Sequence, residues 1–213
     1  EVLNKMRAQM GSFLFSAQYQ QTPETPEGGI FKRKYFKMVA QMPEMTELGY
    51  VCVSFDCAMS TSDQADYTAI TVAYVEEGQY TVLEVQRGRW DYEHIKVIAL
   101  RYVQRFGPEV IFVVEAANVG FSLASYLRDK RFRSYPYRPV DSKLGRAAQM
   151  LPVFEAGQVN ILNIEGKNAW VEPLLNEFVS FPGCRHDDQV DSLIQLLWFA
   201  KQNPYPSGRV ILC

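Results

Sequence analysis

Three consecutive segments of the chain have the residue pattern of β-strands, and no other feature limits the fold as strongly. Residues 50–56, 67–75 and 80–88 are rich in β-branched and aromatic residues and are separated by short polar loops, one of which contains EEGQ. Strands joined by short loops run antiparallel, because such a loop returns the chain alongside the strand it has just left. We therefore predict a three-stranded antiparallel meander over residues 50–88.

A helix and an interior strand are predicted next. Residues 91–106 space their apolar side chains at intervals of three and four, as in a helix that buries one face, with Asp91 as its N-cap. Gly107 and Pro108 end this helix, and residues 110–114 form a continuous apolar run typical of a strand that is covered on both faces. A strand reached across a helix pairs parallel to its neighbour, so we expect a mixed sheet.

The rest of the chain alternates helical and extended patterns. A meander followed by a parallel strand reached across a helix is the arrangement of the ribonuclease H-like fold, an α/β fold whose mixed central sheet is flanked by helices. This fold analogy supplies no function by itself. The further predicted elements are helices over residues 119–129, 143–156 with an interruption at Pro152, 168–178 and 187–200, and extended segments over residues 134–140 and 158–162.

The last predicted helix begins with a group of acids. The stretch GCRHDDQVDSLIQLLWFA places Asp187, Asp188 and Asp191 in the first turn of an otherwise apolar segment. Carboxylates at this position can accept hydrogen bonds from free backbone N–H groups and complement the helix dipole. Three like charges this close also repel one another, unless a cation lies among them. The pattern leaves both a plain helix start and a metal site open.

Two further acids end predicted strands. Asp56 follows VSF at the end of the first strand, and Glu115 follows IFVV at the end of the interior strand. If these strands are neighbours, the two carboxylates meet at one edge of the sheet, and the acidic helix start can close a third side. Turn chemistry is an ordinary explanation for Asp56 alone, whereas Glu is a poor turn former.

Carboxylates gathered in this way predict a metal site. Unpaired carboxylates are costly to bury, so we expect a divalent cation or a basic partner beside them. Oxygen ligands without suitably spaced Cys or His favour Mg²⁺ or Mn²⁺. Two such ions about 3.5 to 4 Å apart are a common device for cleaving a phosphodiester bond.

Composition limits the remaining classes of protein. The 213 residues spread their apolar side chains evenly, which favours one sizeable domain, and no apolar run is long enough to cross a bilayer. No secretion signal opens the chain and its four cysteines form no CxxC pair, so we expect reduced thiols inside a cell. The net charge of −2 argues against a surface coated in basic residues. One basic stretch permits nucleic-acid contact, although most charge runs are simply solvated; it contains Arg128, Lys130, Arg131, Arg133, Arg138, Lys143 and Arg146.

The N-terminal segment is predicted to be a separate unit. It begins with helical spacing and then reaches TPETPEGG, where two prolines and two adjacent glycines end any regular element. We therefore predict that residues 1–46 are a helix and linker and that residues 47–213 form the folded domain. Because the chain begins with Glu, we also expect it to be a piece of a longer protein.

Four stretches resemble one known family in order and spacing. FDCAMSTSDQADYTAI, VVEAANVG, DSKLGRAAQM and FVSFPGCRHDDQVDSL are similar to the nuclease domain of the large terminase subunit of tailed bacteriophages and prophages, over residues 30–200. SAQYQQTPETPEGGIFKRKYF resembles the connection between the ATPase and nuclease domains of that family. No GxxxxGK[ST] motif is present, so we expect an isolated nuclease portion that does not hydrolyse ATP by itself.

The resemblance implies roles for the acids. It makes Asp56 the central metal ligand, Glu115 the second, and Asp187 with Asp188 the third position, with Asp56, Glu115 and Asp188 catalytic. Helical phase alone favours Asp187 or Asp191 over Asp188. Asp191 is then either an auxiliary ligand or a structural acid.

The resemblance also implies contacts with DNA. Lys143 and Arg146 match a basic pair of the family and are expected to touch the scissile backbone, although solvated helix charges are the alternative. His186 is expected either to position water or DNA or to serve as a residue that caps the helix. The other expected DNA-binding residues are Arg128, Lys130 and Arg131.

The implied function is a metal-dependent endonuclease that cuts concatemeric double-stranded DNA at the start and end of genome packaging, using Mg²⁺ or Mn²⁺ and two ions. Its expected partners are double-stranded DNA, the ATPase domain of the same full-length chain, the portal protein and the small terminase subunit, in the host-cell cytoplasm and without a membrane. Two alternatives remain: another nuclease of the same fold, of the resolvase or transposase type, and a catalytically idle module that binds DNA or the portal.

Overall fold

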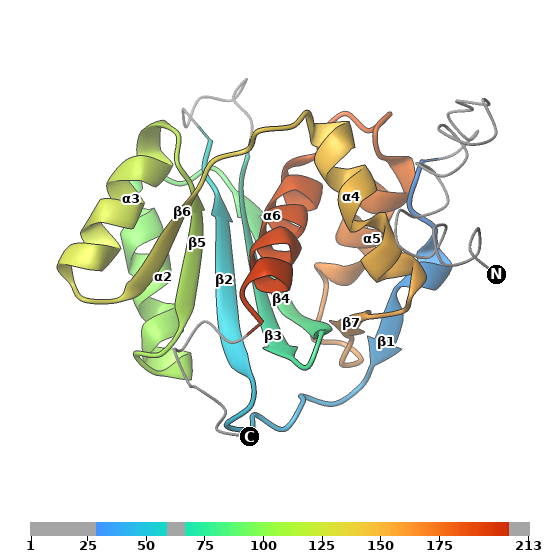
Figure 1. Ribbon diagram of the computed structural model, residues 1–213, viewed down its shortest axis with the longest axis horizontal. Helices are drawn as coiled ribbons and strands as arrows, with labels where there is room; N and C mark the ends of the chain where they lie inside the picture. Colours follow the sequence, from blue (N-terminus) through green and yellow to red (C-terminus); the bar gives the residue numbers. More distant parts are fainter. Residues whose placement is uncertain (1–28, 59–66, 205–213) are drawn as a thin grey trace.

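A seven-stranded mixed sheet forms the centre of the molecule in the computed structural model, which describes residues 29–58 and 67–204 (Figure 1). The strands lie in the order β1-β7-β4-β3-β2-β5-β6. Their bounds are β1 Lys37–Val39, β2 Tyr50–Asp56, β3 Thr68–Glu76, β4 Gln79–Gly88, β5 Ile111–Glu115, β6 Arg133–Tyr137 and β7 Val159–Leu162.

The meander and the parallel strand are both confirmed. β2, β3 and β4 pair antiparallel in sequence order. β5 pairs parallel to β2, and β6 continues the sheet parallel to β5. On the other side, β7 pairs parallel to β4 and β1 pairs parallel to β7. The predicted ribonuclease H-like arrangement is therefore present.

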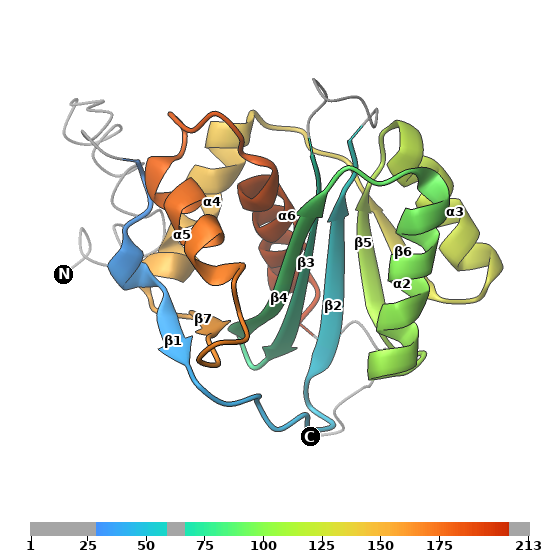
Figure 2. The same ribbon diagram turned by 180° about the vertical axis from the view of Figure 1, so that it is seen from behind.

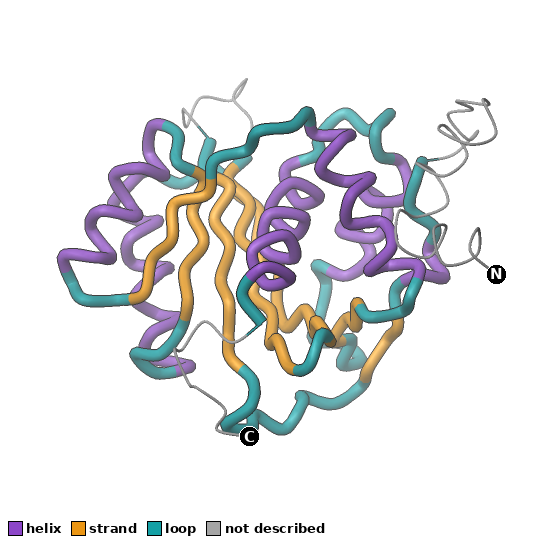
Figure 3. The backbone as a smooth tube through the Cα atoms, in the orientation of Figure 1, coloured by secondary structure: helices purple, strands orange, loops and turns teal. Residues whose placement is uncertain are grey.

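Helices cover both faces of the sheet, as the tube drawing makes clear (Figure 3). α2 and α3 pack on one face, and α4, α5 and α6 pack on the other (Figures 1 and 2). The helices are α2 Tyr92–Phe106, α3 Asn118–Asp129, α4 Lys143–Glu155, α5 Val171–Ser180 and α6 Asp188–Gln202, with a short 3-10 helix at Arg33–Tyr35. No helix in residues 29–58 or 67–204 is long and apolar enough to span a membrane.

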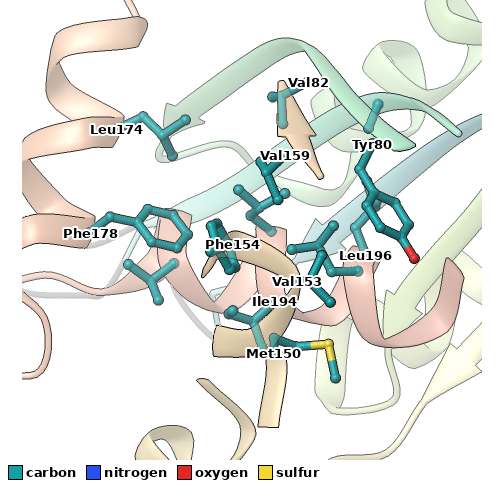
Figure 4. Close-up of a cluster of buried hydrophobic side chains, with 14 of the residues drawn as sticks. Tyr80, Val82, Met150, Val153, Phe154, Val159, Leu174, Phe178, Ile194 and Leu196 are labelled. Carbon is teal, nitrogen blue, oxygen red and sulfur yellow. The ribbon is translucent and has the colours of Figure 1, made fainter. Parts of the chain in front are cut away.

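The core beneath α4, α5 and α6 fixes the position of α6. Figure 4 shows Ile194 and Leu196 of α6 among apolar side chains from α4, α5 and the strands. Phe154 of α4 is fully buried there and its ring lies 5.5 Å from that of Phe178 in α5. Because α6 is held by packing along its length, its first turn is held in a fixed place over the sheet.

One prediction about α4 differs from the structure. The helix runs through Pro152 without the predicted interruption. Pro152 lies in the last turn, so the loss of its N–H removes one intrahelical hydrogen bond near the point where the helix ends anyway.

Residues ahead of the meander also contribute to the fold. The segment predicted as a linker contains β1, and it packs Ile30, Phe31 and Phe36 into the core. The Phe31 ring lies 4.8 Å from that of Phe154. A three-residue strand is too short to show alternation, so the pattern of residues 37–39 gives no warning of it. The predicted N-terminal helix and almost all of TPETPEGG lie outside the described residues, and the connection to an ATPase domain stays a prediction.

We expect Phe31→Ala to lower the free energy of unfolding by about 3–5 kcal/mol, the usual cost of deleting a buried phenyl ring. Urea unfolding followed by circular dichroism measures the change. Phe121→Ala serves as the control, because Phe121 is 52% exposed and its loss should stay within about 0.5 kcal/mol of wild type. Equal stability of both variants would show that residues before β1 are not part of the folded unit.

Candidate active site

Asp56 and Glu115 end two neighbouring parallel strands. The register of β2 and β5 pairs Phe55 with Val114, so the next residue of each strand, Asp56 and Glu115, lies beside the other at the same edge of the sheet. Both residues are half-buried, and their carboxyl groups lie within hydrogen-bonding reach of each other. Burial, this hydrogen bond and the negative charges around it raise the pKa of Asp56 well above its ordinary value.

The first turn of α6 brings two more carboxylates to this edge. Asp188 and Asp191 are buried, with 6% and 7% of their surfaces exposed, and both act on the pKa of Asp56 through their negative charge. Asp187 precedes the helix with non-helical backbone angles and is only half-buried. Helical phase favoured Asp187 or Asp191 as the acid nearer the buried face, whereas the structure buries Asp188 and Asp191, because an ideal helical wheel does not apply across the point where a helix begins. Which of the three binds a metal stays a prediction.

The acids of α6 do not serve as its N-terminal caps. Asp187 occupies the N-cap position, yet its side chain accepts no capping hydrogen bond. The free backbone N–H groups of Gln189 and Val190 instead donate to the carboxylate of Glu177 in α5, at 2.7 and 3.0 Å. Capping by the aspartates thus does not explain why three of them gather here.

Two basic residues of α4 lie against these acids. Lys143 Nζ lies 2.7 Å from Asp187 Oδ1 and 2.8 Å from Asp191 Oδ2. Arg146 Nη2 lies 3.0 Å from Asp191 Oδ1 and its side chain is buried. Burial alone lowers the pKa of Lys143, but its hydrogen bonds to Asp187 and Asp191 raise the pKa above its ordinary value. Lys143 and Arg146 are therefore engaged by aspartates, and their predicted contacts with DNA stay a prediction.

The remaining basic residues lie elsewhere. Arg128, Lys130 and Arg131 follow one another at the far end of α3 and in the loop before β6. α3 begins three residues after Glu115, and its 12 residues span about 18 Å; Figure 1 shows the helix running away from that edge of the sheet. The structure does not bring this basic group to the acids.

His186 lies next to the acids. Its Nδ1 is 4.0 Å from Asp188 Oδ2, and its ring contacts the edge of Tyr67 with a centroid separation of 5.2 Å. His186 does not cap α6, because the carboxylate of Glu177 accepts hydrogen bonds from the free N–H groups at the start of that helix. A role in positioning water or DNA stays a prediction.

The sequence pattern did not single out Gln195, which joins α6 to both acid-bearing strands. Its side chain is buried, and Nε2 lies 2.9 Å from Ser54 Oγ, 3.2 Å from Phe55 O and 3.1 Å from Val113 O. These acceptors precede Asp56 and Glu115 by one or two residues. The sequence could have indicated Gln195, because it is a polar residue at a position of α6 that faces the core.

We expect Gln195→Leu to keep the fold but to weaken the site. Leucine fills similar space, whereas the link that sets the distance between α6 and the two strands is lost. Residues that orient metal ligands typically change metal affinity or activity by about 10–100-fold. Mn²⁺ titration by calorimetry and plasmid cleavage would measure the loss, with the exposed Gln202→Leu on the same helix as control. Unchanged Mn²⁺ affinity and cleavage would show that the link is dispensable.

The donor set suits a hard divalent cation. Within residues 29–58 and 67–204, no three His, Cys, Asp or Glu side chains already stand in the arrangement of a metal site. The carboxyl groups of Asp56 and Glu115 nevertheless lie side by side with Asp188 close enough to act on Asp56, and burial, together with these neighbouring negative charges, raises the pKa of Asp56. All-oxygen donors of this kind are those that Mg²⁺ and Mn²⁺ prefer. The chemistry of Asp56, Glu115 and Asp188 thus fits such an ion.

A mixed sheet with carboxylates at the ends of two adjacent parallel strands, and a further carboxylate on a helix laid over them, defines a ribonuclease H-like domain. Residues 53–198 match the family model described as terminase RNaseH-like domain. The chain belongs to this family. No curated protein sequence matches it.

Solved structures of the same fold come from phages and from human cytomegalovirus. The large terminase nuclease of thermophilic phage G20c with bound zinc is 19% identical, with a TM-score of 0.56 over 76% of this chain and 93% of that one. The human cytomegalovirus terminase nuclease domain, Mn soaked and inhibitor bound, is 16% identical, with a TM-score of 0.54 over 76% and 87%. The large terminase of a second thermophilic bacteriophage, in complex with ADP, is 11% identical, with a TM-score of 0.67 over 97% of this chain but 52% of that one. These likenesses show the fold.

Proposed function

We propose that this terminase nuclease domain is a divalent-metal-dependent endodeoxyribonuclease that cuts concatemeric double-stranded DNA at the start and end of genome packaging. The observation that carries the proposal is the convergence of Asp56, Glu115 and Asp188 at one edge of the sheet. The G20c nuclease has been solved with zinc, cobalt and magnesium bound, which supports divalent metal use in this chain. The proposed ion is Mg²⁺ or Mn²⁺, with two ions in the complete site.

The residues of this chain have distinct tasks in the proposed reaction. Asp56, Glu115 and Asp188 hold the metal. When bound, a divalent ion activates water and stabilises the leaving oxygen of the phosphodiester. Lys143 holds Asp187 and Asp191 and so limits the negative charge that a phosphate would meet. Asp191, paired with two basic residues, is a better candidate for a structural acid than for an auxiliary ligand, while Asp187 stays with Asp188 a candidate for the third ligand position.

The proposed partners follow from the family. We propose that the chain works beside an ATPase domain, since the large terminase of the second thermophilic phage, of which this chain covers about half, was solved in complex with ADP. Double-stranded DNA, the portal protein and the small terminase subunit complete the proposed assembly, in the cytoplasm of the host cell.

Plasmid cleavage tests the proposal. We expect nicking and linearisation of supercoiled plasmid with Mg²⁺ or Mn²⁺, and none with excess EDTA. A parallel reaction on a four-way DNA junction separates the alternatives, because a resolvase cuts the junction far faster than linear duplex. Absence of cleavage with every divalent metal, at protein concentrations that bind DNA, would favour a catalytically idle DNA-binding module.

A further inference from the structure

We propose that Tyr67, Arg89, Arg185 and His186 form a second DNA-binding surface, which contacts the phosphate backbone on the β4 side of the acids. The inference rests on the proposed function, since it concerns the substrate of that site. These four residues are called the arginine–tyrosine surface below. They come from the ends of β3 and β4 and from the loop between α5 and α6.

The strand register places this surface beside Asp56. Asp56 pairs with Ala69 across β2 and β3, and Ala69 pairs with Arg87 across β3 and β4. Residues directly opposite one another project from the same face of a sheet, and two strand spacings amount to about 10 Å. Arg87 thus lies on the same face as Asp56. Tyr67 and Arg89 are two residues from Ala69 and Arg87, so they continue that face at the edge where the acids lie.

Ring contacts join Tyr67, Arg89 and His186 into one group, and Arg185 directly precedes His186 in the chain. The guanidinium of Arg89 lies 4.1 Å from the centroid of the Tyr67 ring, and that of Arg87 lies 4.9 Å from it. The His186 ring meets the Tyr67 ring edge-on at 5.2 Å, and His186 is followed directly by Asp187. The tyrosine ring therefore lies between the arginines of β4 and the start of α6.

An arginine stacked on an aromatic ring is well suited to bind phosphate. Stacking fixes the plane of the guanidinium and leaves its N–H groups directed outward, so less side-chain entropy is lost on binding. Guanidinium groups bind phosphate oxygens in a bidentate manner, with stronger hydrogen bonds than neutral donors make. The guanidinium of the half-buried Arg89 is already held against the Tyr67 ring, 4.1 Å from its centroid, before DNA arrives.

The distribution of charge favours this side of the site. Arg87 is paired with Glu177 at 2.9 Å, and on the opposite side Lys143 and Arg146 are paired with aspartates. Arg185 is exposed, and within the described part of the chain it makes no ion pair. The acids themselves repel phosphate, so DNA that approaches them needs cations nearby. The exposed Arg185, which directly precedes His186, meets that need at the same edge.

Salt-dependent binding tests the proposal. Labelled duplex DNA would be titrated with the 213-residue chain in EDTA, and affinity followed by fluorescence anisotropy over a range of KCl concentrations. Each lost phosphate contact lowers the slope of log Kobs against log salt by about 0.9. We expect one such decrement for Arg185→Ala, one for Arg89→Ala, and about two for the double variant. Tyr67→Leu should weaken binding, whereas Tyr67→Phe keeps the ring and should bind like wild type.

Arg101→Ala is the matched control, because Arg101 is exposed on α2 and lies on the other face of the sheet. Arg185→Ala carries the test even if Arg89→Ala or Tyr67→Leu fails to fold, since an exposed loop residue contributes little to stability. Wild-type slopes for the Arg185 variant and for every folded variant, with metal-dependent cleavage intact, would overturn this inference and leave the proposed function standing. A wild-type chain that neither binds nor cuts DNA would overturn the proposed function, and the inference with it.

Discussion

Asp56→Asn is expected to abolish DNA cleavage. Asp56 ends β2 beside Glu115 at the end of β5, and burial and the negative charges of Glu115, Asp191 and Asp188 raise its pKa, so it is the main candidate of the acid site. Asparagine keeps the size of the side chain but removes the charge that binds a divalent cation. We expect cleavage to fall by more than about a hundredfold, because the loss of a residue that merely supports a ligand costs about 10–100-fold.

The stability of the Asp56→Asn variant is expected to be equal to or higher than that of wild type. The raised pKa of Asp56 means that its ionised form is disfavoured in the folded, metal-free protein. A neutral side chain removes that penalty, so Asp56→Asn should unfold in EDTA at the same or a higher urea concentration than wild type. Loss of cleavage without loss of stability is therefore the expected pair of results.

Plasmid cleavage and urea unfolding of the same preparations measure both quantities. Asp129→Asn is the control, because Asp129 is an exposed acid at the end of α3 and its replacement should change neither. Wild-type cleavage by Asp56→Asn would exclude Asp56 from the reaction and return the acids of this edge to a structural role.

Glu177→Ala is expected to destabilise the domain by about 2–4 kcal/mol, because it leaves several buried donors without a partner, at about 1–3 kcal/mol each. The Glu177 carboxylate accepts from the backbone N–H groups of Gln189 and Val190, from Gln189 Nε2 at 2.6 Å and from Arg87 Nη1 at 2.9 Å. Alanine leaves several of these donors without a partner in a place that water reaches poorly.

Glu177→Gln separates the two functions of this side chain. Glutamine retains an oxygen that can accept from the helix N–H groups, but it loses the charge opposite Arg87, so we expect a smaller loss than with alanine. Glu172→Ala on the same helix is the matched control. Its ion pair with Arg33 is exposed on both sides, with 63% and 52% of the side chains accessible, and such pairs contribute about 0–1 kcal/mol. Equal urea midpoints for Glu177→Ala and Glu172→Ala would contradict the capping role.

Patterns local in the sequence predicted much of this fold. Alternating and continuous apolar runs identified β2 to β5, and Gly107 with Pro108 marked the end of α2. The adjacency of Asp56 and Glu115 followed from topology, because a strand reached across one helix pairs parallel with its neighbour.

Interactions between distant residues were beyond such patterns. Glu177 caps a helix whose first residue lies 11 positions later, and Gln195 bonds to strands more than 80 positions earlier, so neither leaves a periodic signal. Arg128 and Arg146 share one basic stretch of sequence, yet a helix end and a buried aspartate hold them in different surroundings. The predicted DNA-binding residues were grouped because they are close in the sequence, although the structure does not bring all of them together.

The order of the strands has a mechanical consequence. β1 is the edge strand through which the chain enters the sheet, and β7, β4 and β3 lie between it and β2. Tension applied to the chain ahead of residue 29 acts first on the backbone hydrogen bonds from Gly29 and Ile30 to Val179 and Phe181 and on the buried side chains within residues 30–36, and only then on the three-residue pairing of β1 with β7. The strands that carry Asp56 and Glu115 lie on the far side of the antiparallel meander from that load. A pull on the N-terminal side would thus strain the edge of the sheet before it altered the spacing of the acids.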